Sequence, residues 1–321
     1  MKDGKKRRLA GIAAAFMAAV GFCGAPVQAA PVAPYSPQRL EQLMDKVSTA
    51  DKSCPGGCGL EDTINRYGIR PQLVTSKQFD LFVPGQGKWI VGRQQGNNMY
   101  LNGSYPDAML IETVAHETRH AWQKRELGAV SAQLDPRRAL ILNRFREADA
   151  FAFGIYFTYR VEQATGETLV RVPASPMKYK DMHPYYRMYA MFKLDMDSGM
   201  PLPMAYRSLV RNCFEHVNSV DYDGDFLSEL EERAKKMTPG QQHTLPEAAF
   251  TQILRRMGTP GFEGGYGAFD AWSDAELRDL HKSGGITPAN LARLEKLEGA
   301  VVQSSAPQSK AGKNKPPQRQ S

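Results

Sequence analysis

The segment TVAHETRHAWQ, residues 113–123, constrains the fold of this chain more than any other part of the sequence. It lies in a stretch of helical character that begins after Ser104, where Ser-Tyr-Pro-Asp resembles a capping box with proline in the first turn, and stops at Gly128. The pattern therefore predicts a helix over residues 105–127. Residues four apart share one face of a helix, so His116 and His120 are expected to present their imidazoles to the same point.

Two imidazoles on one helix face favour a metal site, and Glu117 stands at the edge of that face. There its carboxylate can reach a metal-bound water without binding the metal, as a general base must. A catalytic zinc also needs a third protein ligand. Glu147 is the candidate, because it lies on an otherwise apolar stripe of a second predicted helix, residues 136–166, where a lone carboxylate is costly. A short loop between the two helices would make them antiparallel.

These residues resemble a known group of enzymes. HExxH followed by a glutamate on a second helix resembles the gluzincin group of zinc metallopeptidases, and EADAFA, residues 147–152, is similar to the Glu-Ala-x-x-Phe-Ala signature of the ImmA/IrrE-type peptidases. The resemblance implies a zincin-like body in which zinc is bound by His116, His120 and Glu147, with Glu117 as catalytic base. It also implies that the strand KWIVGRQQ, residues 88–95, aligns an extended substrate.

Arg119 departs from the gluzincin pattern, since an uncharged residue is more usual inside the motif. This residue points instead toward a group of predicted metallopeptidases with sequences like HETRHAWQ. The resemblance extends from Trp89 to Phe157 and does not account for the helices beyond residue 175.

Four further side chains are weaker candidates for the site. Asp149 is expected either to hydrogen-bond a ligand histidine or its helix, or to be an exposed carboxylate. His183, Tyr185 and Tyr186 form a polar aromatic cluster after the site helices. They are candidate donors to the oxyanion of a tetrahedral intermediate, or else residues that cap and pack a helix start.

The first 29 residues read as a cleaved signal peptide, with basic side chains, an apolar run and a small-residue ending, Val27-Gln28-Ala29. The apolar run, Leu9 to Phe22, is shorter than the roughly 20 residues of a membrane span. A periplasmic or secreted location is therefore expected. Export favours oxidation, which predicts a Cys54–Cys58 disulfide and leaves Cys213 buried and reduced.

The distribution of charge excludes one class of partner. Residues 1–29 contribute +4 and the tail after residue 304 contributes +4 to the net charge of +7, so the body between them is close to neutral. A nucleic-acid-binding surface would need clustered Lys and Arg on the folded body. The tail, residues 305–321, lacks apolar residues and is expected to be disordered, either as a solubilising extension or as a weak contact to anionic envelope surfaces.

The predicted class is α+β, with a small antiparallel sheet followed by a mostly helical, zincin-like body that holds the site between two antiparallel helices. The expected units are a signal peptide (1–29), a helix and Cys-containing loop (30–69), the metallopeptidase core (70–170), a helical region (171–304) and the basic tail (305–321). Helices are expected at 36–51, 105–127, 136–166, 184–198, 203–217, 223–237, 245–257, 274–282 and 288–298.

The expected function is zinc-dependent hydrolysis of a peptide or amide bond in a peptide, a protein or peptidoglycan, with Glu117 as general base. Two alternatives remain: a zinc-stabilised envelope protein without turnover, and an interaction module that uses the helical C-terminal half.

Overall fold

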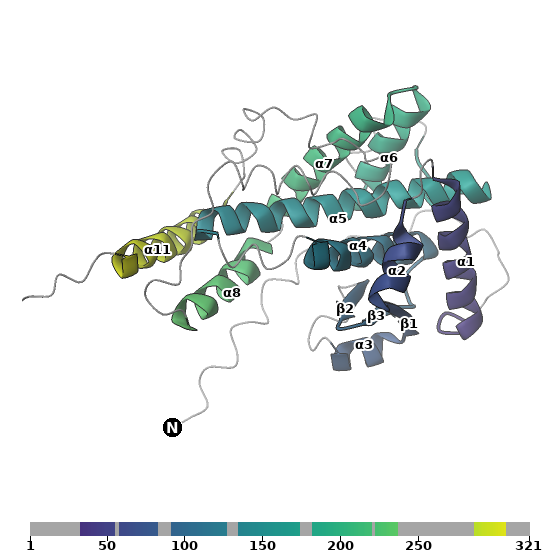
Figure 1. Ribbon diagram of the computed structural model, residues 1–321. Helices are drawn as coiled ribbons and strands as arrows, with labels where there is room; N and C mark the ends of the chain where they lie inside the picture. The colour runs from purple at the N-terminus through teal and green to yellow at the C-terminus, as the bar shows by residue number, and fades with distance from the viewer. Residues whose placement is uncertain are drawn as a thin grey trace, which may run out of the picture.

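The computed structural model describes residues 33–54, 58–82, 91–126, 134–173, 182–219, 222–236 and 286–305. These residues form a mostly helical body with a small sheet on one side (Figure 1), which confirms the α+β class. The predicted signal peptide, the predicted helices 245–257 and 274–282, and the tail after Ser305 lie outside the described residues. Within the described part of the chain, no helix combines the length and the apolar character that crossing a membrane requires.

The N-terminal region contains one predicted helix and one that was not predicted. Helix α1, Pro37–Ser53, begins at Ser36, whose hydroxyl accepts a hydrogen bond from the backbone of Arg39. Helix α2, Leu60–Tyr67, occupies part of the segment that the sequence predicts as a loop. Its start is capped from a distance, because the carboxylate of Asp51 accepts the N–H groups of Leu60 and Glu61.

The predicted disulfide is confirmed: Cys54 and Cys58 are bonded and connect the end of α1 to the start of α2. Cys213 is buried and unpaired, also as predicted. Both N-terminal helices contribute side chains to the same hydrophobic core as the site helices, among them Leu43, Val47, Leu60 and Ile64. The segment is thus part of the folded body.

The sheet contains strands β1 (Arg70–Val74), β2 (Gly92–Gln95) and β3 (Asn98–Asn102), in the order β1-β3-β2. The prediction that it is antiparallel is wrong in part, because β2 pairs antiparallel with β3 whereas β1 pairs parallel with β3. The physical reason is helix α3, Ser76–Phe82, in a segment predicted as strand. Parallel pairing needs a crossover connection between the paired strands, and α3 lies in that connection.

The start of α3 has a local cause. The side chain of Thr75 accepts a hydrogen bond from the backbone of Gln78, and the side chain of Gln78 accepts one from the backbone of Thr75. This reciprocal arrangement is a capping box, which fixes the beginning of a helix.

Helices α4 (Asp107–Glu126) and α5 (Pro136–Thr165) form the centre of the molecule, and both were predicted. Asp135 caps the start of α5, and Gly166, with φ of 71°, ends it in the left-handed conformation. Side-chain contacts pair early α4 with late α5 and late α4 with early α5, so the two helices are antiparallel. They approach closely at Gly154, where a Cβ would lie 2.8 Å from the backbone oxygen of Glu112.

The remaining described helices are α6 (Pro184–Asp197), α7 (Leu202–Ser219), α8 (Tyr222–Lys236) and α11 (Pro288–Ser305). All four were predicted, although α11 continues to Ser305 where the sequence predicts an end at residue 298. The large core lies among α1, α2, β3, α4, α5, α6 and α7. A smaller core joins the first turns of α5 to α8 and α11 through Ala139, Leu140, Leu227, Leu230, Leu294 and Leu297. Helix α5 runs through both cores (Figure 1).

Candidate metal centre

The fold brings together the three residues that the sequence predicts as metal ligands. His116 and His120 lie one turn apart on α4, and Glu147 faces them from α5. Each offers one ligand atom, and these atoms all lie within 4.8 Å of one another. Two nitrogen donors and one carboxylate oxygen that converge in this way could hold a metal ion.

The spacing of the donor atoms fits a small tetrahedral ion. The Nε2 atoms of the two histidines are 3.0 Å apart, and Oε2 of Glu147 lies 3.3 Å from Nε2 of His120 and 3.8 Å from Nε2 of His116. Zinc binds nitrogen and oxygen at about 2.0–2.1 Å, so neighbouring ligands in a tetrahedral site are about 3.3 Å apart. The donors are therefore placed for a common ion with little movement.

The electrostatics of His116 and Glu147 match a cation site, whereas a cation would have to displace the proton that a raised pKa keeps on His120. Burial, together with the neighbouring His120, lowers the pKa of His116 to about 3, which keeps its imidazole neutral as a metal ligand must be. Burial opposes charge on His120 and Glu147 as well, but their mutual attraction outweighs it, so the pKa of His120 is raised and that of Glu147 is lowered. Glu147 thus stays ionised and attracts positive charge to the point where the donors meet.

Glu117 connects the candidate metal centre to the sheet. Its Oε2 accepts a hydrogen bond of 3.1 Å from the backbone N–H of Gln94 in β2. Burial raises the pKa of Glu117, although His120 and the Gln94 N–H partly oppose the shift. A carboxyl group whose pKa is raised toward neutrality is suited to take up and return a proton.

The Nδ1 atom of each histidine faces a polar side chain that the sequence analysis did not predict. Nδ1 of His120 lies 2.9 Å from Oε1 of Gln123. Nδ1 of His116 faces Oε1 of Glu112 at 3.7 Å, and neither atom has a hydrogen-bond partner among the described residues. Burial, followed by repulsion from Glu117, raises the pKa of Glu112 to about 8. Helical spacing was the available signal, because Gln123 follows His120 by three residues and Glu112 precedes His116 by four.

Asp149 lies behind the site and is fully buried, so the alternative of an exposed carboxylate is wrong. Its Oδ2 accepts hydrogen bonds from Arg119 Nε at 2.7 Å and from Gln123 Nε2 at 2.8 Å, and its Oδ1 accepts from Arg119 Nη2 at 3.1 Å. Asp149 therefore bonds the helix that carries the histidines. Arg119, the residue that departs from the gluzincin pattern, is its ionic partner across the helix interface.

The aromatic residue of EADAFA forms one wall of the centre. The ring of Phe151 packs edge-on against His116, with ring centroids 4.5 Å apart. An apolar wall limits the rotation of this imidazole and keeps water away from one side of it.

The three predicted oxyanion donors lie at the start of helix α6. His183 is the N-cap of α6, and its Nδ1 accepts a hydrogen bond from the backbone of Tyr185. The hydroxyl of the buried Tyr185 donates to Thr158, and Tyr186 packs against the ring of Tyr185. These contacts agree with the capping and packing alternative, and an oxyanion role for the three residues stays a prediction.

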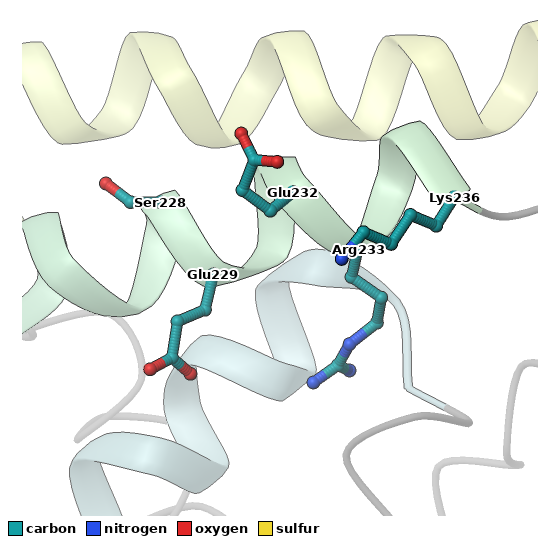
Figure 2. Close-up of a pocket in the computed structure, with 5 residues that line it drawn as sticks. All are labelled: Ser228, Glu229, Glu232, Arg233 and Lys236. Carbon is teal, nitrogen blue, oxygen red and sulfur yellow. The ribbon is translucent and has the colours of Figure 1, made fainter.

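A separate hollow lies on α8 and is lined by Ser228, Glu229, Glu232, Arg233 and Lys236. Figure 2 shows that Glu232 points toward α11, whereas Glu229 and Arg233 point to the opposite side of α8. The charged groups of this hollow diverge, so they do not form a ligand set as the groups of the candidate metal centre do.

Comparison with protein-family models, curated proteins and solved structures finds no match to this chain.

Proposed function

We propose that the protein is a zinc-dependent metallopeptidase of the gluzincin type that hydrolyses a peptide or amide bond. The observation that carries the proposal is the convergence of His116, His120 and Glu147 on one point, with Glu117 adjacent to the histidine pair. Three protein ligands leave a fourth position of a tetrahedral zinc open, which distinguishes catalytic sites from structural ones.

A zinc ion held there would supply Lewis acidity toward a carbonyl oxygen and lower the pKa of water. The protein groups do the remaining work. Glu117 accepts a proton from the attacking water and returns it to the departing amine. The N–H of Gln94 holds one oxygen of that carboxylate, so the proton acceptor has a defined position before substrate arrives.

The substrate in this proposal is an extended chain with an amide bond: a peptide, a protein or a peptidoglycan cross-link. Strand β2 is an edge of the sheet and is joined to Glu117 by the Gln94 hydrogen bond, so it is the part of KWIVGRQQ that lies beside the site. An edge strand has backbone groups that can pair with an extended substrate. This supports the expectation from resemblance that the substrate lies along β2.

We also propose that the protein acts in the periplasm or outside the cell. The Cys54–Cys58 disulfide supports this location, because disulfides persist in oxidising compartments.

The decisive experiment uses Glu117→Gln, which keeps the size of the side chain but removes its basicity. Purified protein would be supplied with zinc and incubated with a mixture of internally quenched peptides of randomised sequence. We expect the wild type to cleave peptides and Glu117→Gln to lose activity by about 10²- to 10⁴-fold. Elemental analysis should find close to one zinc per chain in both proteins, since Glu117 is not a ligand.

The matched control is Glu41→Gln, the same change at an exposed position on α1, which should cleave as the wild type does. Equal cleavage by Glu117→Gln and the wild type would overturn the mechanism. Loss of zinc from Glu117→Gln alone would show that this residue is a ligand and not the base.

A second candidate function is a zinc-stabilised scaffold without turnover. It is favoured by the fact that the three donors join α4 to α5, the two helices at the centre of the core. In that case zinc would raise the stability of the wild type, and neither the wild type nor Glu117→Gln would cleave any peptide.

A further inference from the structure

Gln123 is a fully buried amide that makes three hydrogen bonds. Its Nε2 donates to Oδ2 of Asp149 at 2.8 Å and to the backbone oxygen of Arg146 at 3.0 Å. Its Oε1 lies 2.9 Å from Nδ1 of His120. A buried side chain with every polar atom engaged has one orientation that satisfies its surroundings.

The partners of Gln123 determine which way its amide points. Both groups facing Nε2, a carboxylate and a carbonyl, only accept hydrogen bonds. If the amide were reversed, its oxygen would face two acceptors and its NH₂ group would face the histidine. Oε1 must therefore face His120 and accept a hydrogen from Nδ1. The unprotonated nitrogen of neutral His120 is then Nε2, the atom that faces His116 and Glu147.

Asp149 is fixed in turn by Arg119. The guanidinium of Arg119 binds both carboxylate oxygens, and neither side chain has exposed surface. Arg119 also stacks on Trp122, with its central carbon 4.1 Å from the ring centroid. The charge of Arg119 offsets the cost of burying the Asp149 carboxylate. The two hydrogen bonds from the guanidinium hold this carboxylate where it accepts from Gln123.

We propose that Gln123 is a positioning residue that presets His120 for metal binding through Nε2, and that Arg119 and Asp149 act through Gln123. This inference rests on the proposed metal centre, because presetting a tautomer matters only if His120 is a ligand. It assigns a role to three residues outside the ligand set and explains why a charged residue occupies the fourth position of HETRH. The extended pattern is therefore His116-Glu-x-Arg-His-x-x-Gln123 on α4, completed by Glu-x-Asp on α5.

The test replaces Gln123 with methionine, which has a similar length and no hydrogen-bonding amide. Zinc affinity would be measured by competition with a chromophoric chelator. We expect Gln123→Met to bind zinc about 10- to 100-fold more weakly, the loss typical of removing an outer partner of a ligand histidine. A long-range ¹H–¹⁵N spectrum of the zinc-loaded, histidine-labelled wild type should show His120 bound through Nε2, with a slowly exchanging Nδ1 proton that Gln123→Met lacks.

The control for simple destabilisation is Asp51→Ala, which removes the cap of α2 without touching the centre. It should lower the unfolding temperature and leave zinc affinity unchanged.

Wild-type zinc affinity in folded Gln123→Met, or an unchanged Nδ1 proton signal, would overturn the proposal. If Gln123→Met does not fold, the wild-type spectrum decides: a zinc-loaded wild type in which His120 binds zinc through Nδ1, or lacks the slowly exchanging Nδ1 proton, contradicts the inference. Absence of zinc binding by the wild type would overturn this inference and the proposed function together. Zinc binding without peptide cleavage would contradict only the peptidase, because the positioning test measures affinity.

Discussion

Arg119 is a charged side chain with no exposed surface, and its contacts explain why α4 can carry it there. A buried guanidinium is costly unless its charge is paired and its N–H groups are hydrogen-bonded. Asp149 supplies the counter-charge from α5 and accepts hydrogen bonds from Nε and Nη2, and the ring of Trp122 covers one face of the guanidinium. The pair therefore fixes how α4 and α5 face each other at the level of the metal centre.

Removing one member of this pair should destabilise the protein much more than removing both. In the metal-free protein, Asp149→Ala leaves a buried guanidinium without its counter-charge and should reduce the free energy of unfolding by about 3–5 kcal/mol in urea. The double variant Arg119→Met with Asp149→Leu removes both charges and keeps the volume, so it should lose less than Asp149→Ala. A double variant that is less stable than the single one would contradict this view of the pair.

The ligands could be predicted from the sequence, but of their supports only Asp149 was predicted, and its partners were not. His116 and His120 share a face whatever surrounds their helix, and Glu147 is conspicuous as a carboxylate on an apolar stripe. The link between Arg119 and Asp149 spans 30 positions and depends on how far α5 slides along α4. Helical periodicity predicts the face on which a residue lies, not the register between two helices.

At the scale of elements, the antiparallel pair α4 and α5 depends on one small residue at their crossing. A Cβ on Gly154 would lie 2.8 Å from both the backbone oxygen and Oε1 of Glu112. No real Cβ comes this close to a backbone atom, so any larger residue must push the helices apart. The contact is one turn of α4 away from His116, and the separation of the helices sets the distance from the histidines to Glu147.

Gly154→Ala should therefore destabilise the protein, by about 1–3 kcal/mol as for other overpacked cores. The matched control is Gly299→Ala on α11, where nothing lies within 4 Å of the added Cβ. The same change at that exposed helical position should stabilise the protein by about 0.4–1 kcal/mol, because alanine restricts the unfolded chain. Urea unfolding of the two variants should show shifts of opposite sign, and a stabilising Gly154→Ala would contradict the close approach.

The helices were predicted better than the sheet for a physical reason. Long helical segments with marked ends, such as 136–166, can be recognised from local sequence alone. The segment 76–82 has two phenylalanines and lies between the β-branched pair Val74-Thr75 and Val83, which favours a strand, but its helical state depends on the Thr75–Gln78 capping box. Once α3 forms, it lies in the crossover connection between β1 and β3, which therefore pair in parallel. One misassigned element thus changed the topology of the whole sheet.

At the scale of the molecule, the proposed zinc site joins the two central helices of the large core. A ligand that binds only the folded state stabilises it by mass action. The three donors come from α4 and α5, so an ion held there would resist the separation of these helices. The fold and the metal should therefore be thermodynamically coupled.

Zinc at about 1,000 times its dissociation constant should raise the free energy of unfolding by about 4 kcal/mol, and a chelator should reverse the effect. Calorimetry with and without zinc would measure the shift in unfolding temperature. His116→Ala, which removes one donor, should respond weakly or not at all. A shift of the same size in His116→Ala would place the stabilising zinc elsewhere in the protein.

Glu147 faces the histidines only if the 30-residue helix α5 keeps a fixed rotation about its own axis. A helix can roll about its own axis without breaking any of its internal hydrogen bonds, and a small roll would swing Glu147 away from the histidines. Two guanidinium–carboxylate pairs oppose this rotation. Just before Glu147, Arg144 of α5 donates to Asp223 of α8. Just after it, Asp149 of α5 accepts from Arg119 of α4. In one pair α5 provides the cation and in the other the anion. The direction in which Glu147 points is thus fixed by contacts on both sides, with α8 and with α4.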